Sequence, residues 1–218
     1  MAGFKIVGNH GSTMIDENYK NFNLTATGYV TTPQAGQNVM YDYGGVTYTG
    51  RNPLVAFRPL GDFSVGATGT YLDGNGVYHT DFITGGSGSL QYYVFDTVPD
   101  YTGSTFGVQV RNASGAVTFD SNLRYLRILE IFHSYNGRSV PVTGRTEAAI
   151  FCTPDSSVEG GFGGYTYFWN GVRSQTGALY PGSIYLEYTD TSDYGNNNDY
   201  NSGYDYPPVT CLVDVTGY

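Results

Sequence analysis

Residues 106–120, FGVQVRNASGAVTFD, decide the fold of this chain. The segments 106–111 and 116–120 are rich in valine and phenylalanine, which favour extended strands because they pack well on a pleated surface. The four residues between them, Asn112 to Gly115, include the asparagine and glycine that tight turns favour. Two strand-forming segments joined by a short turn predict a β-hairpin.

Strand and turn signals repeat along the rest of the chain about every 8 to 12 residues, a spacing typical of β-sandwiches and barrels. The turn Asp73-Gly74-Asn75-Gly76 predicts a second hairpin between residues 70–72 and 77–82. Residues 123–131 fit a short helix or a buried strand, and we favour the strand. A strand at residues 38–43 is expected to end at Gly44-Gly45. The remaining strands are expected at residues 4–7, 13–16, 22–30, 54–57, 90–95, 148–153, 165–169, 184–188 and 210–215.

The composition also predicts an all-β chain. Among the 218 residues are 22 tyrosines, 12 phenylalanines and 31 glycines, whereas charged residues make up only 13%. No long segment shows the apolar period of a helix. We expect an antiparallel β-sandwich, either jelly-roll or immunoglobulin-like. Residues 1–136 would form its core and 137–218 additional strands or a small lobe with long Tyr-, Gly- and Asn-rich loops, or 1–218 would form one domain.

Charge and hydropathy exclude several partners. The net charge of −9 opposes binding to nucleic acid, which requires clustered Lys and Arg. No run reaches the roughly 20 apolar residues of a membrane helix. Met1 to Lys5 leads into a strand signal without the regions of a secretory signal, so we expect synthesis in a reducing cytoplasm. Cys152 and Cys211 each lie in an apolar run, which favours two buried thiols over a disulfide.

Residues 190–208 differ in composition from the rest. The sequence DTSDYGNNNDYNSGYDYPP has no aliphatic side chain, so it predicts a long exposed loop. Its oxygen-bearing side chains suit a hard cation such as Ca²⁺. Their spacing lacks the acidic pattern of a calcium-binding loop, and we therefore favour a solvated loop and expect no metal. The candidate calcium ligands are Asp190, Asp193, Asp199 and Asp205.

Tyrosines in the last third form the candidate binding surface. Tyrosine offers a flat apolar face and a hydroxyl at low entropic cost, as in antibody loops rich in Tyr, Ser, Gly and Asn. Such rings would stack on sugars, or they would pack on a neighbouring subunit. In a third interpretation, Tyr167 and Trp169 alternate as core and rim of an ordinary strand. The candidate residues are Tyr165, Tyr167, Trp169, Tyr194, Tyr200, Tyr204 and Tyr206.

The sequence does not indicate catalysis. His10 lies in a turn, His79 on a hairpin strand and His133 after an apolar run, and none has a nucleophile-elbow pattern nearby. Glutamates are few and most aspartates lie in turns, so no pair of carboxylates suits glycoside hydrolysis. No Cys/His cluster suits zinc. We expect no catalytic residue and no cofactor.

Two segments resemble small tail proteins of tailed bacteriophages. In residues 3–30, GFKIVGNHG and IDENYKNFNL precede GYV. In residues 106–127, FGVQVRNASG is followed by VTFDSNLRYLR, which is similar to the β-sandwich proteins associated with tail tips and fibres. The resemblance implies a virion component at the tail tip, baseplate or fibre, assembled in the host cytoplasm, without catalysis. Residues from 137 onward carry no such resemblance.

The functional expectation is a non-enzymatic structural protein of the phage tail that binds other tail proteins and copies of itself. One alternative is a receptor-binding module for a host glycan or pilus, with the Tyr-rich loops as its site. Another is a head decoration protein or surface-layer subunit. The loop at residues 190–208 separates the first two, because a loop buried against a partner is architectural and a loop exposed at a distal tip is adhesive.

Overall fold

The computed structural model describes most of the chain, and every regular element in the described part is a β-strand. All pairings between these strands are antiparallel. The all-β antiparallel sandwich expected from the composition is confirmed. The described residues are 5–7, 9, 13–16, 20–32, 42–97, 106–133, 144–152, 156–161, 164–175, 178–188, 201–202 and 209–218. The strands are β1 (Lys5–Val7), β2 (Thr13–Asp16), β3 (Asn23–Thr31), β4 (Asp42–Tyr48), β5 (Leu54–Pro59), β6 (Ser64–Leu72), β7 (Tyr78–Thr84), β8 (Ser89–Asp96), β9 (Gln109–Arg111), β10 (Val117–Asp120), β11 (Ile128–His133), β12 (Glu147–Phe151), β13 (Ser156–Gly161), β14 (Gly164–Gln175), β15 (Ala178–Tyr188), β16 (Asn201–Ser202) and β17 (Val209–Asp214).

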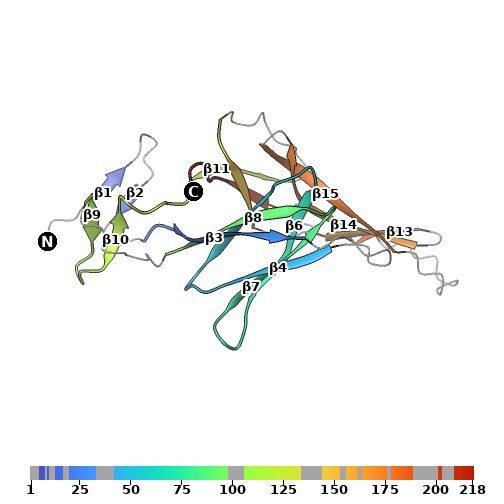
Figure 1. The fold of residues 1–218 in the computed structure, drawn as a ribbon, viewed down its shortest axis with the longest axis horizontal. Coiled ribbons are helices and arrows are strands. Elements are labelled where there is room, and N and C mark those ends of the chain that lie inside the picture. The colour runs from blue at the N-terminus through green and yellow to red at the C-terminus, as the bar shows by residue number, and fades with distance from the viewer. Residues whose placement is uncertain are drawn as a thin grey trace.

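Two large sheets pack face to face and form the sandwich (Figure 1). The first sheet contains six strands in the order β11-β17-β12-β5-β8-β3. The second contains β16-β13-β14-β6-β7-β4, and β15 pairs with the other side of β14. Each sheet combines strands from before and after residue 137, because β12 pairs with β5 and β14 pairs with β6. The division expected between residues 136 and 137, with one single domain as its alternative, stays a prediction.

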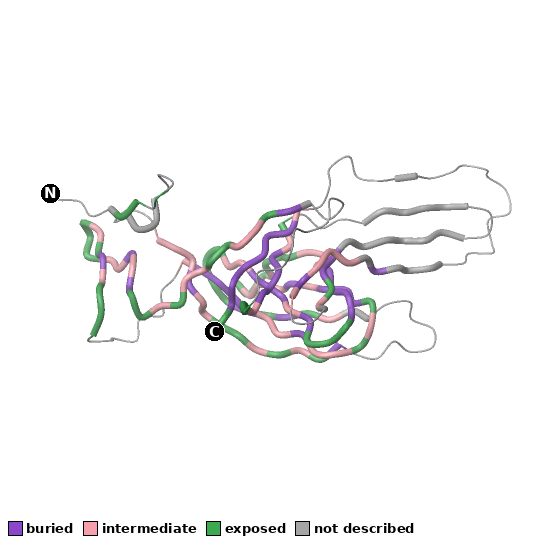
Figure 2. Tube along the Cα trace, turned by 90° about the horizontal axis from the view of Figure 1, so that it is seen from above, coloured by how far each residue is buried: buried purple, intermediate pink, exposed green. Residues whose placement is uncertain are grey.

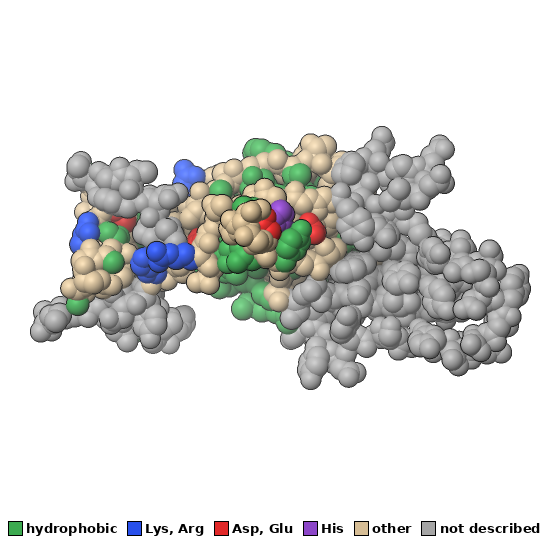
Figure 3. Space-filling model, turned by 90° about the horizontal axis from the view of Figure 1, so that it is seen from below, with side chains coloured by type: hydrophobic (Ala, Val, Ile, Leu, Met, Phe, Trp, Pro, Cys, Tyr) green, Lys and Arg blue, Asp and Glu red, His purple; other side chains and the backbone are tan. Residues whose placement is uncertain are grey.

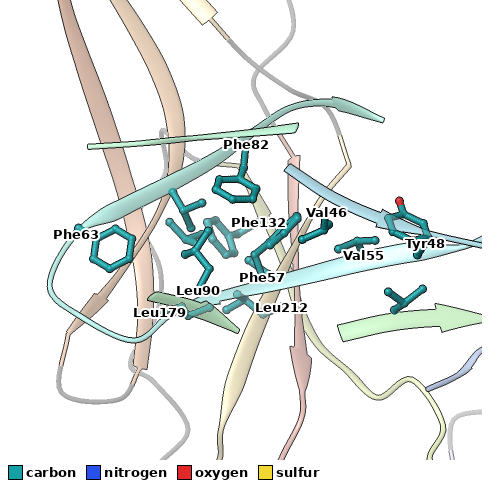
Figure 4. Packing of buried hydrophobic residues seen from close by; sticks show 14 residues of the cluster. Val46, Tyr48, Val55, Phe57, Phe63, Phe82, Leu90, Phe132, Leu179 and Leu212 are labelled. Atoms are coloured by element: carbon teal, nitrogen blue, oxygen red, sulfur yellow. The ribbon is translucent and has the colours of Figure 1, made fainter. Parts of the chain in front are cut away.

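The main core lies between these two sheets and contains large side chains from both. Phe57 on β5 and Phe82 on β7 meet there, with ring centroids 5.6 Å apart and ring planes inclined at 59°. Figure 4 shows Phe82 pointing from its strand toward Phe57 and Phe132, which belong to the opposite sheet. Figure 2 shows buried residues gathered where the sheets overlap. These aromatic contacts hold the sheets together, because each ring removes about 150–250 Å² of surface from water.

The outer face of the six-stranded sheet carries a second apolar cluster. Tyr93 and Phe95 of β8 belong to it, together with Val213 of β17. Tyr218 covers part of this cluster, with its ring 6.1 Å from that of Phe95. The guanidinium of Arg127 lies 4.9 Å from the centroid of the Tyr218 ring. The six-stranded sheet is therefore apolar on both faces, unlike an antiparallel sheet with one face in water.

Strand β4 is longer than the sequence indicated. Residues 38–41 of the expected strand lie outside the described part, and β4 continues through Gly44 and Gly45 to Tyr48. A Cβ on Gly44 would lie 2.3 Å from Cζ of Phe82. The glycine pair therefore does not end the strand. Glycine is required at position 44 because the Phe82 ring occupies the space above it.

Both predicted hairpins are present. In the turn between β9 and β10, the N–H of Gly115 donates to the Asn112 carbonyl oxygen over 2.9 Å, and Gly115 has a φ of 82°. In the turn between β6 and β7, the N–H of Gly76 donates to the Asp73 carbonyl oxygen over 3.2 Å, and Gly76 has a φ of 79°. Positive φ angles of this kind explain why glycine stands at these two positions.

A small lobe consisting of β1, β2, β9 and β10 extends from one end of the sandwich (Figure 1). It contains two separate two-stranded sheets. A neck of two antiparallel segments joins it to the sandwich: the N–H of Leu24 donates to the Arg124 carbonyl oxygen, and that of Leu126 to the Phe22 carbonyl oxygen. The strand expected over residues 123–131 therefore begins only at Ile128, because the residues before it belong to the neck.

Candidate interaction surfaces

The binding residues expected from the sequence fall mostly outside the described part. Tyr165, Tyr167 and Trp169 occupy alternate positions of β14, where it pairs with β13 and β15. Within residues 190–208, the described pair Asn201–Ser202 forms β16 and pairs with β13. The exposed loop expected there stays a prediction. The other candidates lie outside the described residues, namely Tyr194, Tyr200, Tyr204, Tyr206 and the four calcium candidates Asp190, Asp193, Asp199 and Asp205.

The first surface that the structure does describe lies at the edge of the six-stranded sheet, and we call it the β11 edge surface. It consists of Ile128 and Ile131, with exposed fractions of 57% and 62%. Ile128 is paired with Val213 and Ile131 with Cys211, both members of the outer apolar cluster. The apolar row on the outer face of the sheet therefore continues into solvent at this edge.

The position of β11 in the sheet also indicates an interaction surface. Among the described strands, β11 pairs only with β17, so its other side is an open edge. An open edge offers unpaired N–H and C=O groups to another chain, and proteins usually protect it with lysine or proline. The sequence of β11, ILEIFH, contains neither, and Glu130 is its one acidic residue. Exposed isoleucines beside an open strand edge are typical of a protein–protein contact.

The two cysteines differ from the sequence expectation. Cys211 is buried, as expected, but Cys152 is exposed at the end of β12, and both are free thiols. The expectation of two buried thiols is therefore wrong for Cys152. Burial raises the pKa of Cys211 to about 11. The Cys152 sulfur lies 3.9 Å from the Ile150 carbonyl oxygen, and partial burial of the sulfur raises the pKa of this thiol as well.

The small lobe presents a second apolar surface. The exposed fractions are 88% for Phe106, 59% for Val108, 50% for Val7 and 40% for Ile6. Two-stranded sheets bury little apolar area and are only marginally stable by themselves. Exposed apolar side chains on such a lobe are typical of an interaction surface.

The third surface, which we call the hairpin patch, consists of Tyr71, Asp73, His79 and Asp81 on β6, β7 and their turn. The Tyr71 and His79 rings are stacked, with centroids 4.9 Å apart and planes at 4°. Nε2 of His79 lies 3.2 Å from Oδ2 of Asp73. In Figure 3 a histidine side chain lies among acidic and hydrophobic side chains on the face seen from below. The patch combines an aromatic platform with carboxylates.

Asp73 is fixed by its own turn. Its Oδ1 accepts hydrogen bonds from the N–H groups of Asn75 and Val77, each over 2.9 Å. The hydrogen bond from the Val77 N–H, followed by that from the His79 side chain, lowers the pKa of Asp73 below its ordinary value of 3.8. These contacts stabilise the ionised carboxylate, so the turn and the imidazole orientation depend on the charge of Asp73.

This lowered pKa leads to a prediction about acid. A carboxylate whose folded pKa is depressed stabilises the fold above its unfolded pKa, and this contribution disappears as the pH falls through the folded value. We expect the amide hydrogens of Asn75 and Val77 to lose protection from exchange below about pH 4, after correction for intrinsic rates. Asp73→Asn should remove this pH dependence. Equal corrected protection at pH 6 and pH 2 in the unmodified chain would contradict it.

The sequence contained a signal for the hairpin patch that motif searching missed. The turn closes between Asp73 and Val77, which pairs Tyr71 with His79 and places Asp81 two residues further on the same face. Pairing the residues of the two strands outward from the turn predicts that these side chains lie close together. His79 instead appeared only as an isolated histidine on a strand. The β11 edge surface had no such signal, because the sequence does not reveal which strand forms an edge.

Other features of the described residues offer little for chemistry. A shallow depression at the neck, without room for an enclosed water molecule, is lined by Lys20, Asn21, Asn23, Thr97, Val117, Thr118, Leu123 and Tyr125, none of which carries a carboxylate or an imidazole. No group of three or more His, Cys, Asp or Glu residues that could hold a metal occurs within the described part. The same residues include no helix long and apolar enough to cross a membrane.

Comparison with known proteins identifies no relative: no family model, no curated protein and no solved structure matches this chain.

Proposed function

We propose that this chain is a non-enzymatic structural protein of a bacteriophage virion, located at the tail tip, baseplate or tail fibre, and that it binds neighbouring tail proteins and copies of itself. The virion assignment rests on the resemblance of residues 3–30 and 106–127 to small phage tail proteins. The assembly role rests on one observation above all, the exposed isoleucines at the open edge of β11.

A further observation supports an assembly role. The small lobe exposes Phe106 and Val108 at the end of the molecule opposite β13 and β14 (Figure 1), so apolar surfaces exist on two separate parts of the fold. A chain with two such surfaces is suited to contact two neighbours at once, as a repeating component of an assembly must.

The β11 edge surface is tested by Ile131→Lys. Ile131 is 62% exposed, so a lysine there should leave the folded chain stable but place a charge in the contact. We expect incorporation of the variant into purified phage particles, measured by quantitative mass spectrometry, to fall roughly tenfold or more, which corresponds to about 1.4 kcal/mol of lost contact energy.

The matched control is Tyr29→Lys on β3, the strand at the other edge of the same sheet. The exposed fraction of Tyr29 is 68%. This variant should be incorporated normally. Normal incorporation of Ile131→Lys would show that the contact lies elsewhere. Absence of the unmodified chain from purified particles would reject the virion assignment itself.

The second candidate function is a receptor-binding module on the same tail. The hairpin patch favours it, because a half-exposed tyrosine ring beside carboxylates has the chemistry of a surface that binds sugars or peptides. The patch lies on the second sheet and the β11 edge surface on the first, so one chain has room for both contacts.

A further inference from the structure

The hairpin patch begins with a rigid aromatic platform. Tyr71 is 53% exposed, and the parallel His79 ring, 4.9 Å away between centroids, supports one of its faces. Asp73 orients His79 through Nε2, and two backbone N–H groups in turn fix Asp73. A ring that is already held in place loses little conformational entropy when a ligand stacks on it.

Asp81 adds an open acceptor to this platform. It follows His79 by two residues on β7, which places both on one face of the sheet about 7 Å apart along the strand. Within the described part of the chain, the Asp81 carboxylate has no hydrogen-bond or ion-pair partner. A free carboxylate accepts hydrogen bonds on both oxygens, so it binds two adjacent hydroxyl groups well.

A glycine on β6 keeps the space on one side of Asp81 empty. Gly45 on β4 and Gly69 on β6 are its cross-strand neighbours. A Cβ on Gly45 would lie 2.9 Å from Oδ1 of Asp81, whereas a Cβ on Gly69 would meet nothing within 4 Å. The carboxylate therefore lies close to Gly45 and leaves open space above Gly69. Tyr71, two residues further along β6, borders that space.

We propose that the hairpin patch binds a neutral saccharide, with one pyranose ring packed against Tyr71 above Gly69 and its hydroxyl groups donating to Asp81. The net charge of −9 disfavours anionic glycans. A basic peptide fits less well, because Asp73 is already occupied by two N–H groups and His79. Only one free carboxylate then remains to compensate the desolvation of a cation.

This inference rests on the second candidate function and names both its ligand class and its residues. It is tested on the purified chain, so its outcome is independent of whether the chain belongs to a phage particle. Cellohexaose, maltohexaose, mannohexaose and a galactohexaose are titrated separately and followed by calorimetry. We expect at least one to bind, and Tyr71→Ala to weaken that binding roughly tenfold or more, since exposed tyrosines commonly dominate binding surfaces.

Gly69→Val provides the sharper variant. It places a branched side chain in the proposed sugar position, while its Cβ meets nothing within 4 Å and valine suits a strand, so binding should vanish while the melting temperature stays equal or rises. Tyr29→Ala removes an exposed tyrosine from the other sheet and should bind as the unmodified chain does.

Three results would overturn the proposal. The first is that none of the four hexasaccharides binds. The second is that Gly69→Val binds as well as the unmodified chain. The third is that nona-arginine binds at physiological salt in a Tyr71-dependent manner while no saccharide does, which would assign the patch to a basic protein segment.

Discussion

Phe82→Ala should lower the free energy of unfolding by about 3–5 kcal/mol, the range for removing a fully buried phenylalanine. Phe82 has an exposed fraction of 0%, and its ring lies between the two sheets against Phe57. The backbone of Phe82 is held in its own sheet by hydrogen bonds between β7 and β4, where Phe82 pairs with Gly44. Because this hydrogen-bonded backbone cannot move into the vacated space, the substitution should leave a cavity and give the upper part of the range.

Urea denaturation followed by tryptophan or tyrosine fluorescence measures this loss. Leu72→Ala is the control, since Leu72 lies on the neighbouring strand with an exposed fraction of 54% and should change stability by no more than about 0.5 kcal/mol. If Phe82→Ala cost less than about 1 kcal/mol, the contact between the sheets would be looser than the packing of Phe57 and Phe82 implies.

Gly171→Ala should destabilise the fold by about 3 kcal/mol, the upper end for forcing extra atoms into a packed site, or prevent folding. A Cβ at this position would lie 2.1 Å from the carbonyl oxygen of Val65 and 2.6 Å from its carbonyl carbon. These are backbone atoms of β6, which pairs with β14 at the adjacent position, Val172. A flexible side chain could rotate away from the added Cβ, whereas the backbone of the hydrogen-bonded strand β6 cannot.

Hydrogen exchange distinguishes this mechanism from general destabilisation. The variant should lose amide protection first along β6 and β14, where the two strands are forced apart. Gly69→Ala is the matched control on β6, because a Cβ there meets nothing within 4 Å. Equal stability of the Gly171→Ala and Gly69→Ala variants would mean that the close approach of β14 to β6 is not required.

Local structure was largely predictable from the sequence, because its causes are local. The turns at Asp73–Gly76 and Asn112–Gly115 depend on residues within a few positions of one another, and both hairpins were predicted there. The strand β4 was not predictable to its end. Its Gly44 is explained by the ring of Phe82, which is remote in sequence, so the glycine was interpreted as a turn signal.

The sequence pattern does not predict which distant strands pair with one another. That β12 pairs with β5 and β14 with β6 depends on contacts across about half of the chain, and alternation within a strand does not specify its neighbour. The same holds for the candidate sites. The hairpin patch follows from the register of one turn, whereas the β11 edge surface exists only because β11 has one described neighbour, β17.

The place of β17 between β11 and β12 also constrains how the chain is made. A ribosome produces β11 long before residues 209–214, so the only described neighbour of β11 does not yet exist when β11 emerges. During that interval β3, β5 and β8 have their partners and β12 has only β5, so one side of β12 is also unpaired, and Leu129 and Phe132 lack the strand that anchors them in the core. The nascent chain therefore passes through a stage with an incomplete sheet, whose unpaired strand edges and exposed apolar side chains favour aggregation.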